Sequence, residues 1–388
     1  MTIDHLHDIL ISKAKCHESE KSTMPKTAHD LEIFTVPIRS KTRRTGESRI
    51  IFLSDSHYYY FEGIGGYSSS RRHALMVDAL IREFQTEESF DAVVFLGDTV
   101  HTDHYLAEIR AKHMAKYGSL DTFSIADTTV AEKIVEWRDI YMARLKNAGI
   151  PAFYVNASHD SLSPDLFYNL FGYENNYVLL AGDIAYFICD TYAGERNDRL
   201  QTFGSDIPDG FYKKCVELLS DDRIKEAYVA CHYINEGSNL CNLIAEKKVR
   251  GTIVGHSHYN EALTFQDKPL LQTGHFSRAN TVMLTWGLGF TPFVPLAEDT
   301  PYTTDEEGNP YKDYRKTGSP WQWRVMEHTD GYTESYLVFP EMDYGAFAYD
   351  EHGRHNAFPD FQQPFTEARP SFLGKDAPVD RSYRIFRR

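Results

Sequence analysis

The sequence predicts an α/β fold, and two observations lead to this prediction. Short apolar segments alternate with amphipathic segments from about residue 31 onward, which is the rhythm of strands and helices in an α/β sheet. The apolar segments are also continuous, as in AVVF and TIVG, which is typical of strands buried on both faces. The chain has 388 residues, 42% of them hydrophobic, so it is long enough to bury a substantial core.

The first half of the chain gives these elements in order. Strands are predicted at residues 31–38 and 49–55, on either side of the turn-like, basic segment KTRRTGES. Apolar residues with helical spacing predict a helix around Val77, Leu80, Ile81 and Phe84. A strand follows at 91–98. A second apolar stripe predicts a long helix, which ends at Gly149 before the strand 151–156. Its members are Val130, Ile134, Trp137, Tyr141 and Leu145.

The second half continues the alternation. Strands are predicted at 178–190, 226–231 and 250–255, and a hairpin at 321–340 around Asp330 and Gly331. Helices are predicted around two apolar groups, Phe211, Cys215 and Leu218, and Leu240, Leu243 and Ile244. We expect an N-terminal extension at 1–30, one domain at 31–345, and an extended C-terminal tail at 346–388 that packs on the domain.

Charge and cysteine usage limit the partners and the compartment. The net charge of -15 comes from 56 acidic and 41 basic residues, and it opposes binding to long nucleic acids and anionic membranes. No apolar run approaches the length of about 18 residues that a membrane span requires. Five scattered cysteines without a CxxC pair indicate neither a disulfide framework nor a cysteine zinc site. We expect a soluble cytoplasmic protein with a small substrate; the oligomeric state stays open.

Potential metal ligands follow five of the predicted strands. The segments are SDSHYYY, GDTVHTD, ASHDS, CHYINEG and GHSHYNE. Because the carboxyl ends of strands line the ligand crevice of an open α/β sheet, these segments are expected to converge. Residues two apart would point the same way if the backbone stays extended past the strand end. The candidate ligands are Asp55, His57, Asp98, His232, His256 and His258, with His159 nearby.

The donor set indicates two metal ions. Oxygen and nitrogen donors without a thiolate suit divalent Mn, Fe or Zn. Six ligands are too many for one ion with an open catalytic position, whereas two ions that share a bridging carboxylate would use them all. The sequence therefore predicts a dinuclear centre at one edge of a sheet.

The ordered motifs DSH, GDTVH, ASHD, CH and GHSH resemble those of the calcineurin-like metallophosphoesterases. The pattern of that family is DxH, GD, GNHD or GNHE, H, and GHxH. The match covers roughly residues 47–280, and the hairpin after residue 320 is similar to the closing strands of the family. The resemblance implies a four-layer α/β fold of the α+β type, in which two mixed β-sheets are sandwiched between helices.

The resemblance also implies a role for each ligand. One metal would be held by Asp55, His57 and His258, the other by His232 and His256, with Asp98 bridging. In that family a hydroxide between the metals attacks the phosphorus of a phosphomonoester or phosphodiester. His159 would be the proton donor or a phosphate ligand, and Asp160 would orient it. Further substrate contacts are expected from His101 and His275.

One segment departs from the family pattern. Ala157 and Ser158 stand where GNHD has Gly and Asn. A hydroxyl is a weaker ligand than an amide carbonyl, so a looser second metal is expected, with Ser158 either at the metal or behind its ligands. Asn156 could offer a carbonyl, but it lies farther back along an extended strand. Ser158 near the metal is therefore favoured over Asn156.

Two alternative functions stay open at this point. The first is a nuclease of the DNA-repair branch, against which the net charge argues. The second is a metal-binding scaffold with weakened catalysis, which Ser158 suggests and the presence of His159 and Asp160 opposes. Protein phosphatases and purple acid phosphatases fit less well, because GDTVHTD lacks both the GDxVDRG form and a tyrosine near GD.

Overall fold

Two mixed sheets form the framework of the protein, as the resemblance implied. The structure is a computed structural model that describes residues 31–39, 47–58, 69–85, 90–100, 111, 113–119, 129–160, 162–192, 206–234, 237–256, 262–273, 302–304, 310–312, 323–329, 332–338 and 383–386. The seven-stranded sheet has the order β1 (Ile33–Thr35), β5 (Tyr177–Ala181), β6 (Ile184–Cys189), β7 (Glu226–Cys231), β8 (Val249–Val254), β10 (Lys268–Gln272) and β9 (Ala262–Phe265). The six-stranded sheet has the order β15 (Tyr383–Phe386), β14 (Tyr332–Val338), β13 (Trp323–His328), β2 (Ser48–Leu53), β3 (Ala92–Phe95) and β4 (Ala152–Tyr154). Strands β11 (Tyr302–Thr304) and β12 (Pro310–Lys312) pair separately.

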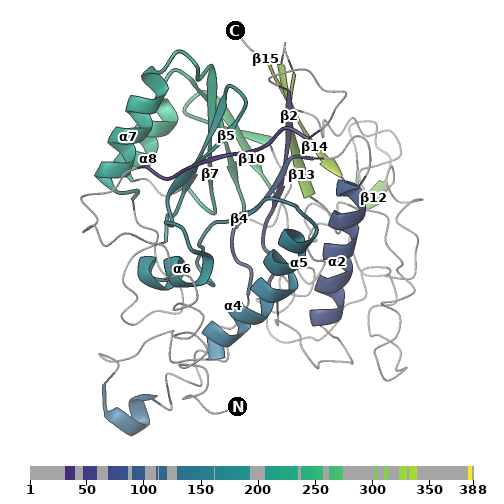
Figure 1. The fold of residues 1–388 in the computed structure, drawn as a ribbon, viewed down its shortest axis with the longest axis vertical. Helices are drawn as coiled ribbons and strands as arrows, with labels where there is room; N and C mark the ends of the chain where they lie inside the picture. The colour runs from purple at the N-terminus through teal and green to yellow at the C-terminus, as the bar shows by residue number, and fades with distance from the viewer. Residues whose placement is uncertain are drawn as a thin grey trace.

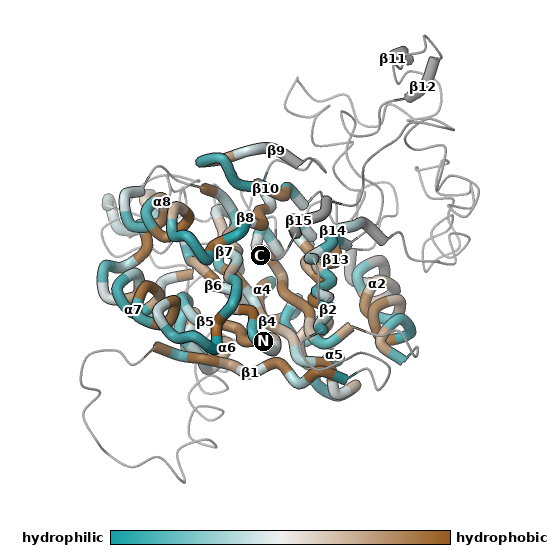
Figure 2. The backbone as a smooth tube through the Cα atoms, turned by 90° about the horizontal axis from the view of Figure 1, so that it is seen from above, coloured by the Kyte–Doolittle hydropathy of each residue, from teal (hydrophilic) through white to brown (hydrophobic). Residues whose placement is uncertain are grey.

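Helices cover the outer faces of the two sheets (Figures 1 and 2). On the side of the six-stranded sheet lie α2 (Ser69–Phe84) and α5 (Met142–Asn147). Helix α4 (Thr129–Ile140) packs on the same sheet, where Trp137 contacts Phe95 of β3. On the side of the seven-stranded sheet lie α7 (Asp209–Ser220) and α8 (Ser238–Ala245). A short helix, α6 (Pro164–Phe171), follows β4. The four layers confirm the predicted fold class.

Apolar packing joins the layers into continuous cores. Strands β6 and β7 are buried along their whole length, as continuous apolar strands predict. Between the sheets, Phe52 of β2 contacts Tyr186 of β6 with a ring-centroid distance of 5.5 Å. On the outer face of the seven-stranded sheet, the apolar faces of α7 and α8 pack against the strands through residues such as Cys215 and Leu240. The sheets are therefore held face to face, and this fixes the relative positions of their strand ends.

The predicted strand at 178–190 is wrong in one respect: it is a hairpin of two strands. β5 and β6 pair antiparallel, with Ala181 opposite Ile184. Gly182 has φ 67 at the turn, a left-handed conformation that glycine adopts without a steric penalty. The two strands predicted around the basic turn lie in different sheets, because β1 pairs with β5 while β2 pairs with β3.

The remaining element predictions agree closely with the structure. The long helical stripe becomes α4 and α5, which meet at Tyr141. The predicted hairpin is confirmed as β13 and β14, which pair antiparallel with His328 opposite Thr333.

β15, near the end of the chain, pairs with β14, while the predicted domain boundaries stay predictions. Within the described residues, no helix has both the length and the apolar character needed to cross a membrane.

Candidate metal centre

The carboxyl ends of strands from both sheets meet at one edge of the molecule. Parallel pairing places the ends of β2, β3 and β4 side by side, and β7 lies beside β8. Beyond the strands, the Asp55 amide donates to the Gly97 carbonyl at 3.0 Å, and the His57 amide donates to the Asp98 carbonyl at 3.0 Å. The His256 amide donates to Oδ2 of Asp55 at 3.0 Å. This last bond connects the two sheets.

The backbone at these strand ends is not extended, so that expectation is wrong. Asp55, His57, Asp98 and His256 have φ values of 55, 42, 48 and 66, in the left-handed region that non-glycine residues rarely adopt. Such strain costs roughly 1–3 kcal/mol per residue and persists where the surroundings enforce it. Hydrogen bonds between 55–58 and 97–99 hold Asp55, His57 and Asp98 in this conformation, and the bond from the His256 amide to Asp55 holds His256. A turn at each ligand, rather than a continued strand, brings the side chains together.

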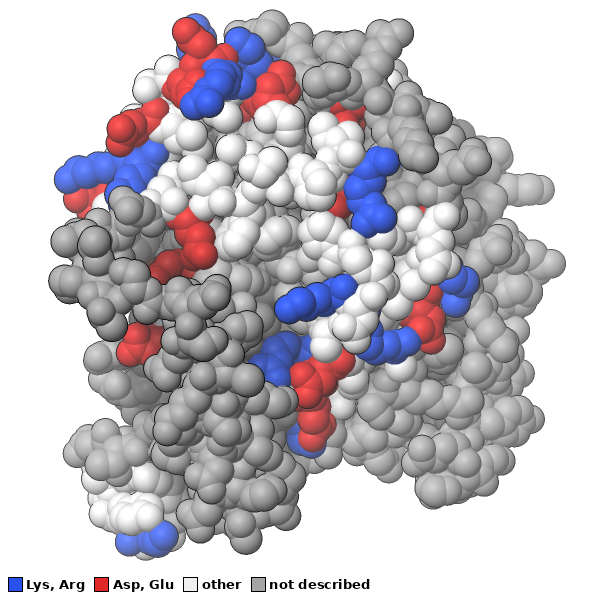
Figure 3. Space-filling view, viewed as in Figure 1, with Lys and Arg blue, Asp and Glu red and all other residues white. Residues whose placement is uncertain are grey.

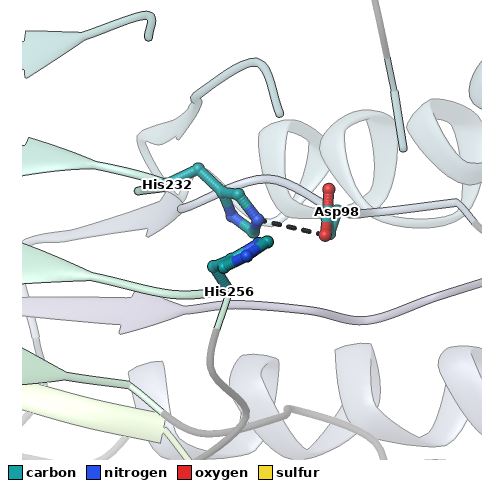
Figure 4. Close-up of side chains that lie close together, drawn as sticks. All are labelled: Asp98, His232 and His256. Carbon is teal, nitrogen blue, oxygen red and sulfur yellow. Dashed lines mark ion pairs between the residues drawn. The ribbon is translucent and has the colours of Figure 1, made fainter. Parts of the chain in front are cut away.

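The side chains form two groups that share one carboxylate. Asp55, His57 and Asp98 make the first group, and Asp98, His232 and His256 make the second. In each group the possible ligand atoms lie within 4.8 Å of one another. Figure 4 shows the rings of His232 and His256 beside the Asp98 carboxylate. Asp98 belongs to both groups, and its role as a bridging ligand stays a prediction.

Asp98 and His232 are electrostatically matched. Burial alone raises the pKa of Asp98, but His232, His159 and His57 together hold it well below the ordinary value. Burial likewise lowers the pKa of His232, yet Asp98 and Asp55 raise it to about 9. The lowered pKa of Asp98 and the raised pKa of His232 have the same cause, because positive charge is stabilised next to the two buried carboxylates of Asp55 and Asp98. A proton or a divalent cation can supply that charge.

The residues fit a metal ion. Nδ1 of His232 lies 2.7 Å from the Leu96 carbonyl, so it carries the proton and leaves Nε2 as an acceptor. Nε2 is buried and lies 3.0 Å from Oδ2 of Asp98. Without a metal, a proton on Nε2 can bind to this oxygen; once the proton leaves, the nitrogen and the carboxylate oxygen face each other and can both bind a cation. This orientation by a backbone carbonyl is common for histidine ligands of metals.

Ser158 and His159 lie against the shared carboxylate. Oγ of Ser158 is 3.2 and 3.3 Å from the two Asp98 oxygens, and the His159 amide donates to Oδ1 at 2.9 Å. The His159 ring lies 5.0 Å from the ring of His57. Asn156 points away, because its Nδ2 donates to the Leu162 carbonyl and to Asp190. Whether Ser158 ligates a metal stays a prediction.

Asp160 is bound to the segment after β3. Its carboxylate accepts from the Thr99 amide at 2.9 Å, from Thr99 Oγ1 at 2.8 Å and from the Val100 amide at 3.1 Å. Burial and the charge of Asp98 raise its pKa to about 6. These bonds fix the loop that carries Asp98 rather than the ring of His159. The predicted role of Asp160 in orienting His159 therefore lacks a hydrogen bond to support it.

Some expected residues cannot be placed, and others were missed. His258, His101 and His275 lie outside the described residues. Tyr192 and Tyr233, whose rings contact His232 and His256, were not among the predicted site residues. A signal existed in both cases, since Tyr233 directly follows His232 and Tyr192 follows the strand end at Asp190.

Comparison with known proteins finds similarity only among solved structures. No family model matches the chain, and no curated protein matches it. A conserved Streptococcus pneumoniae protein described as a predicted phosphoesterase matches with 13% identity and a TM-score of 0.29, covering 76% of this chain and 93% of its own. Vacuolar protein sorting 29 from Cryptosporidium parvum matches with 11% identity and a TM-score of 0.28, covering 75% and 90%. A putative 5′-nucleotidase from Staphylococcus aureus matches with 13% identity and a TM-score of 0.37, covering 80% and 57%.

These likenesses are too low to carry an argument about activity. The observations on the chain itself are the two mixed sheets between helices and the shared carboxylate at their common edge. This arrangement of two mixed sheets between helices is the architecture that the resemblance of the motifs implied.

Proposed function

We propose that the protein is a metal-dependent phosphohydrolase that cleaves a small phosphomonoester or phosphodiester. The observation that carries this proposal is Asp98, which belongs to two groups of possible ligand atoms at once. A carboxylate shared in this way suits two cations held side by side. Such a pair, when bound, polarises the phosphoryl oxygens and lowers the pKa of a water molecule. Manganese, iron and zinc all suit these donors.

The chain's own residues supply the binding and the proton transfer. Asp55 and Asp98 provide negative charge inside a buried edge, where cations bind more strongly than in water. His159 is nearly buried beside Asp98, with its Nε2 3.8 Å from Oδ2. An imidazole at this position can give a proton to the leaving oxygen. Asp160 keeps the Thr99–Val100 backbone, and with it Asp98, in position.

Hydrolysis assays on the metal-free and reloaded protein test the proposal. The protein is stripped with a chelator, reloaded separately with Mn, Fe or Zn, and given a generic phosphomonoester and a generic phosphodiester. We expect turnover of at least one ester only after reloading. His159→Asn should lower kcat about 10²–10⁴-fold while the bound metal per chain stays the same. The matched control is His113→Asn, which changes a histidine outside both groups. No hydrolysis of either ester with any metal would contradict the proposal.

A catalytically weakened scaffold stays the second candidate, because Ser158 stands where the family pattern has a metal-binding asparagine. Metal binding without turnover in the same assay would favour it. A nuclease has less support: in Figure 3 the Lys and Arg side chains of the described residues on the visible face are scattered among Asp and Glu. Long nucleic acids bind to continuous basic surfaces.

A further inference from the structure

Two tyrosines flank the imidazoles of the second ligand group. The rings of His232 and His256 lie 5.2 Å apart at 84°. Tyr192 contacts His232 with a centroid distance of 5.8 Å, and Tyr233 contacts His256 with a distance of 4.7 Å. The two histidines therefore lie between aromatic rings, which come from the segments after β6 and β7. The candidate metal centre has an aromatic wall on this side.

Hydrogen bonds fix the wall in place. Oγ1 of Thr191 donates to the Tyr233 carbonyl at 3.0 Å, which ties the two segments together. The Tyr192 amide donates to Oδ1 of Asp190 at 2.7 Å. Oδ2 of Asp190 accepts from Asn156 at 3.0 Å and from Asn175 at 2.8 Å. The backbone of both tyrosines is thus held before any ligand arrives, which lowers the entropic cost of binding.

The two tyrosines differ in their contact with water. Tyr192 is 4% exposed, whereas Tyr233 is 45% exposed and is one of four large hydrophobic residues that lie open to solvent among the described residues. Its ring is supported on His256, which is itself exposed. An aromatic ring that is held firmly but left half uncovered, next to the reacting centre, can receive a second flat ring.

We propose that Tyr233 is a stacking platform for a planar aromatic group in the leaving portion of the substrate. This inference rests on the proposed phosphohydrolase function. In an in-line displacement the leaving oxygen lies opposite the attacking one, so the leaving group points away from the attacking oxygen. The exposed ring of Tyr233 beside His256 offers that group a flat surface. The substrate class is a phosphate ester that carries a nucleobase or another aromatic ring a few bonds from the phosphorus. Stacking is tolerant of the ring's identity, because every such ring has a π face.

Pairs of primary-alcohol phosphates that differ in the rest of the leaving group test the platform. AMP is compared with ribose 5-phosphate, which lacks the adenine ring, and 2-phenylethyl phosphate with 2-cyclohexylethyl phosphate, in which a non-planar ring of similar size replaces the planar one. We expect the wild type to prefer the aromatic member by about tenfold in kcat/KM. The preference should persist in Tyr233→Phe and fall to near one in Tyr233→Leu. If only the AMP pair responds, the ring is a nucleobase; if both respond, any planar ring suffices.

Tyr332→Leu is the matched control. Tyr332 follows the β13–β14 turn, beyond His328, which pairs with Ser48 at the start of β2. It lies at the edge opposite the metal centre, so its removal should leave the preference unchanged.

Saturation-transfer NMR on the zinc-loaded protein reports binding without turnover when the ligand is the phosphonate analogue of AMP, in which a CH2 group replaces the ester oxygen. The adenine protons of this analogue should receive saturation from the wild type and much less from Tyr233→Leu. Equal transfer in both proteins, or no transfer in either, overturns the inference whether or not esters are hydrolysed. Transfer that depends on Tyr233 without any ester hydrolysis supports the platform and contradicts the phosphohydrolase proposal alone.

Discussion

The two ligand groups of the candidate centre are built differently. The first group, Asp55, His57 and Asp98, comes from the ends of β2 and β3 in one sheet, and all three residues are buried. The second group adds His232 and His256 from the other sheet, and His256 is exposed. We call the buried first group the closed half of the centre and the second group, with its exposed histidine, the open half. Asp98 belongs to both, at the seam where the two sheets meet.

This difference suggests unequal metal binding. The first group is held by backbone hydrogen bonds between neighbouring strand ends, which keep their geometry without help from the second sheet. The second group depends on contacts across the seam, such as the amide of His256 with Asp55. Preorganised ligands bind more tightly because less order is lost on binding. We expect a tight first site and a looser, exchangeable second site.

Asp98→Asn should have the largest effect, because it changes both halves at once. The amide removes the negative charge that the two groups share, and with it the charge balance of His232. We expect both metals to be lost from the purified protein and hydrolysis to fall by at least about 10³-fold, equivalent to several kcal/mol. Metal analysis by mass spectrometry together with ester turnover measures this.

Asp91→Asn is the control for removing a buried carboxylate. Asp91 precedes β3 at the other end of the strand and accepts from the amides of Arg39 and Arg49, each at 2.8 Å. This variant should lose stability but keep its metals. If Asp98→Asn retained two metals per chain, Asp98 would not be the shared ligand.

His57→Ala and His256→Ala compare the halves directly. Removing the buried His57 should empty the tight site and lower kcat about 100-fold, while removing the exposed His256 should weaken only the loose site, by about tenfold, and excess metal should restore activity. Metal titration followed by equilibrium dialysis separates the two results. Equal losses in the two variants, neither restored by metal, would show that the halves are equivalent.

Gly255→Ala tests the close contact between the ends of β2 and β8, where the two halves meet. A Cβ at this position would lie 1.8 Å from Oγ of Ser54 and 2.9 Å from Oδ2 of Asp55, so the ends of β2 and β8 must move apart. We expect a loss of about 1–3 kcal/mol in the free energy of unfolding and weaker binding of the second metal. In Gly210→Ala, the control in α7, the added Cβ meets nothing within 4 Å, and stability should not fall. Denaturant melts of both variants decide the matter; equal stability would contradict the close approach.

The sequence predicted the sheet elements and the convergence of their ends, because both follow from local patterns. Apolar runs mark the buried strands, and parallel strands place their carboxyl ends together. The hairpin at Gly182 was missed because the apolar character continues on both sides of it. The separation of β1 and β2 into different sheets depends on contacts with β5 and β3, which no local pattern contains.

The local geometry of the site was less predictable than its members. A histidine two residues after an aspartate suggested an extended backbone, but left-handed φ values at Asp55 and His57 produce the convergence. These values depend on hydrogen bonds to the segment after β3, which lies more than 40 residues away. Tyr233 was missed for a related reason. Its importance comes from contact with His256 and from its exposure, and a residue type alone indicates neither.

Ser158→Asn should have the smallest effect and addresses the open half alone. The Ser158 hydroxyl lies within hydrogen-bond distance of the Asp98 oxygens, so it donates a hydrogen bond to the carboxylate that the two groups share. An asparagine would offer a carbonyl to the second metal, and we expect its affinity to rise about tenfold. The larger side chain should cost about 1 kcal/mol of stability, because the site is already packed. Ser158→Ala removes the hydroxyl without adding a ligand, and should not tighten binding. If the asparagine variant binds the second metal no more tightly than wild type, then position 158 does not limit the open half, and the exposure of His256 becomes the reason for its weakness.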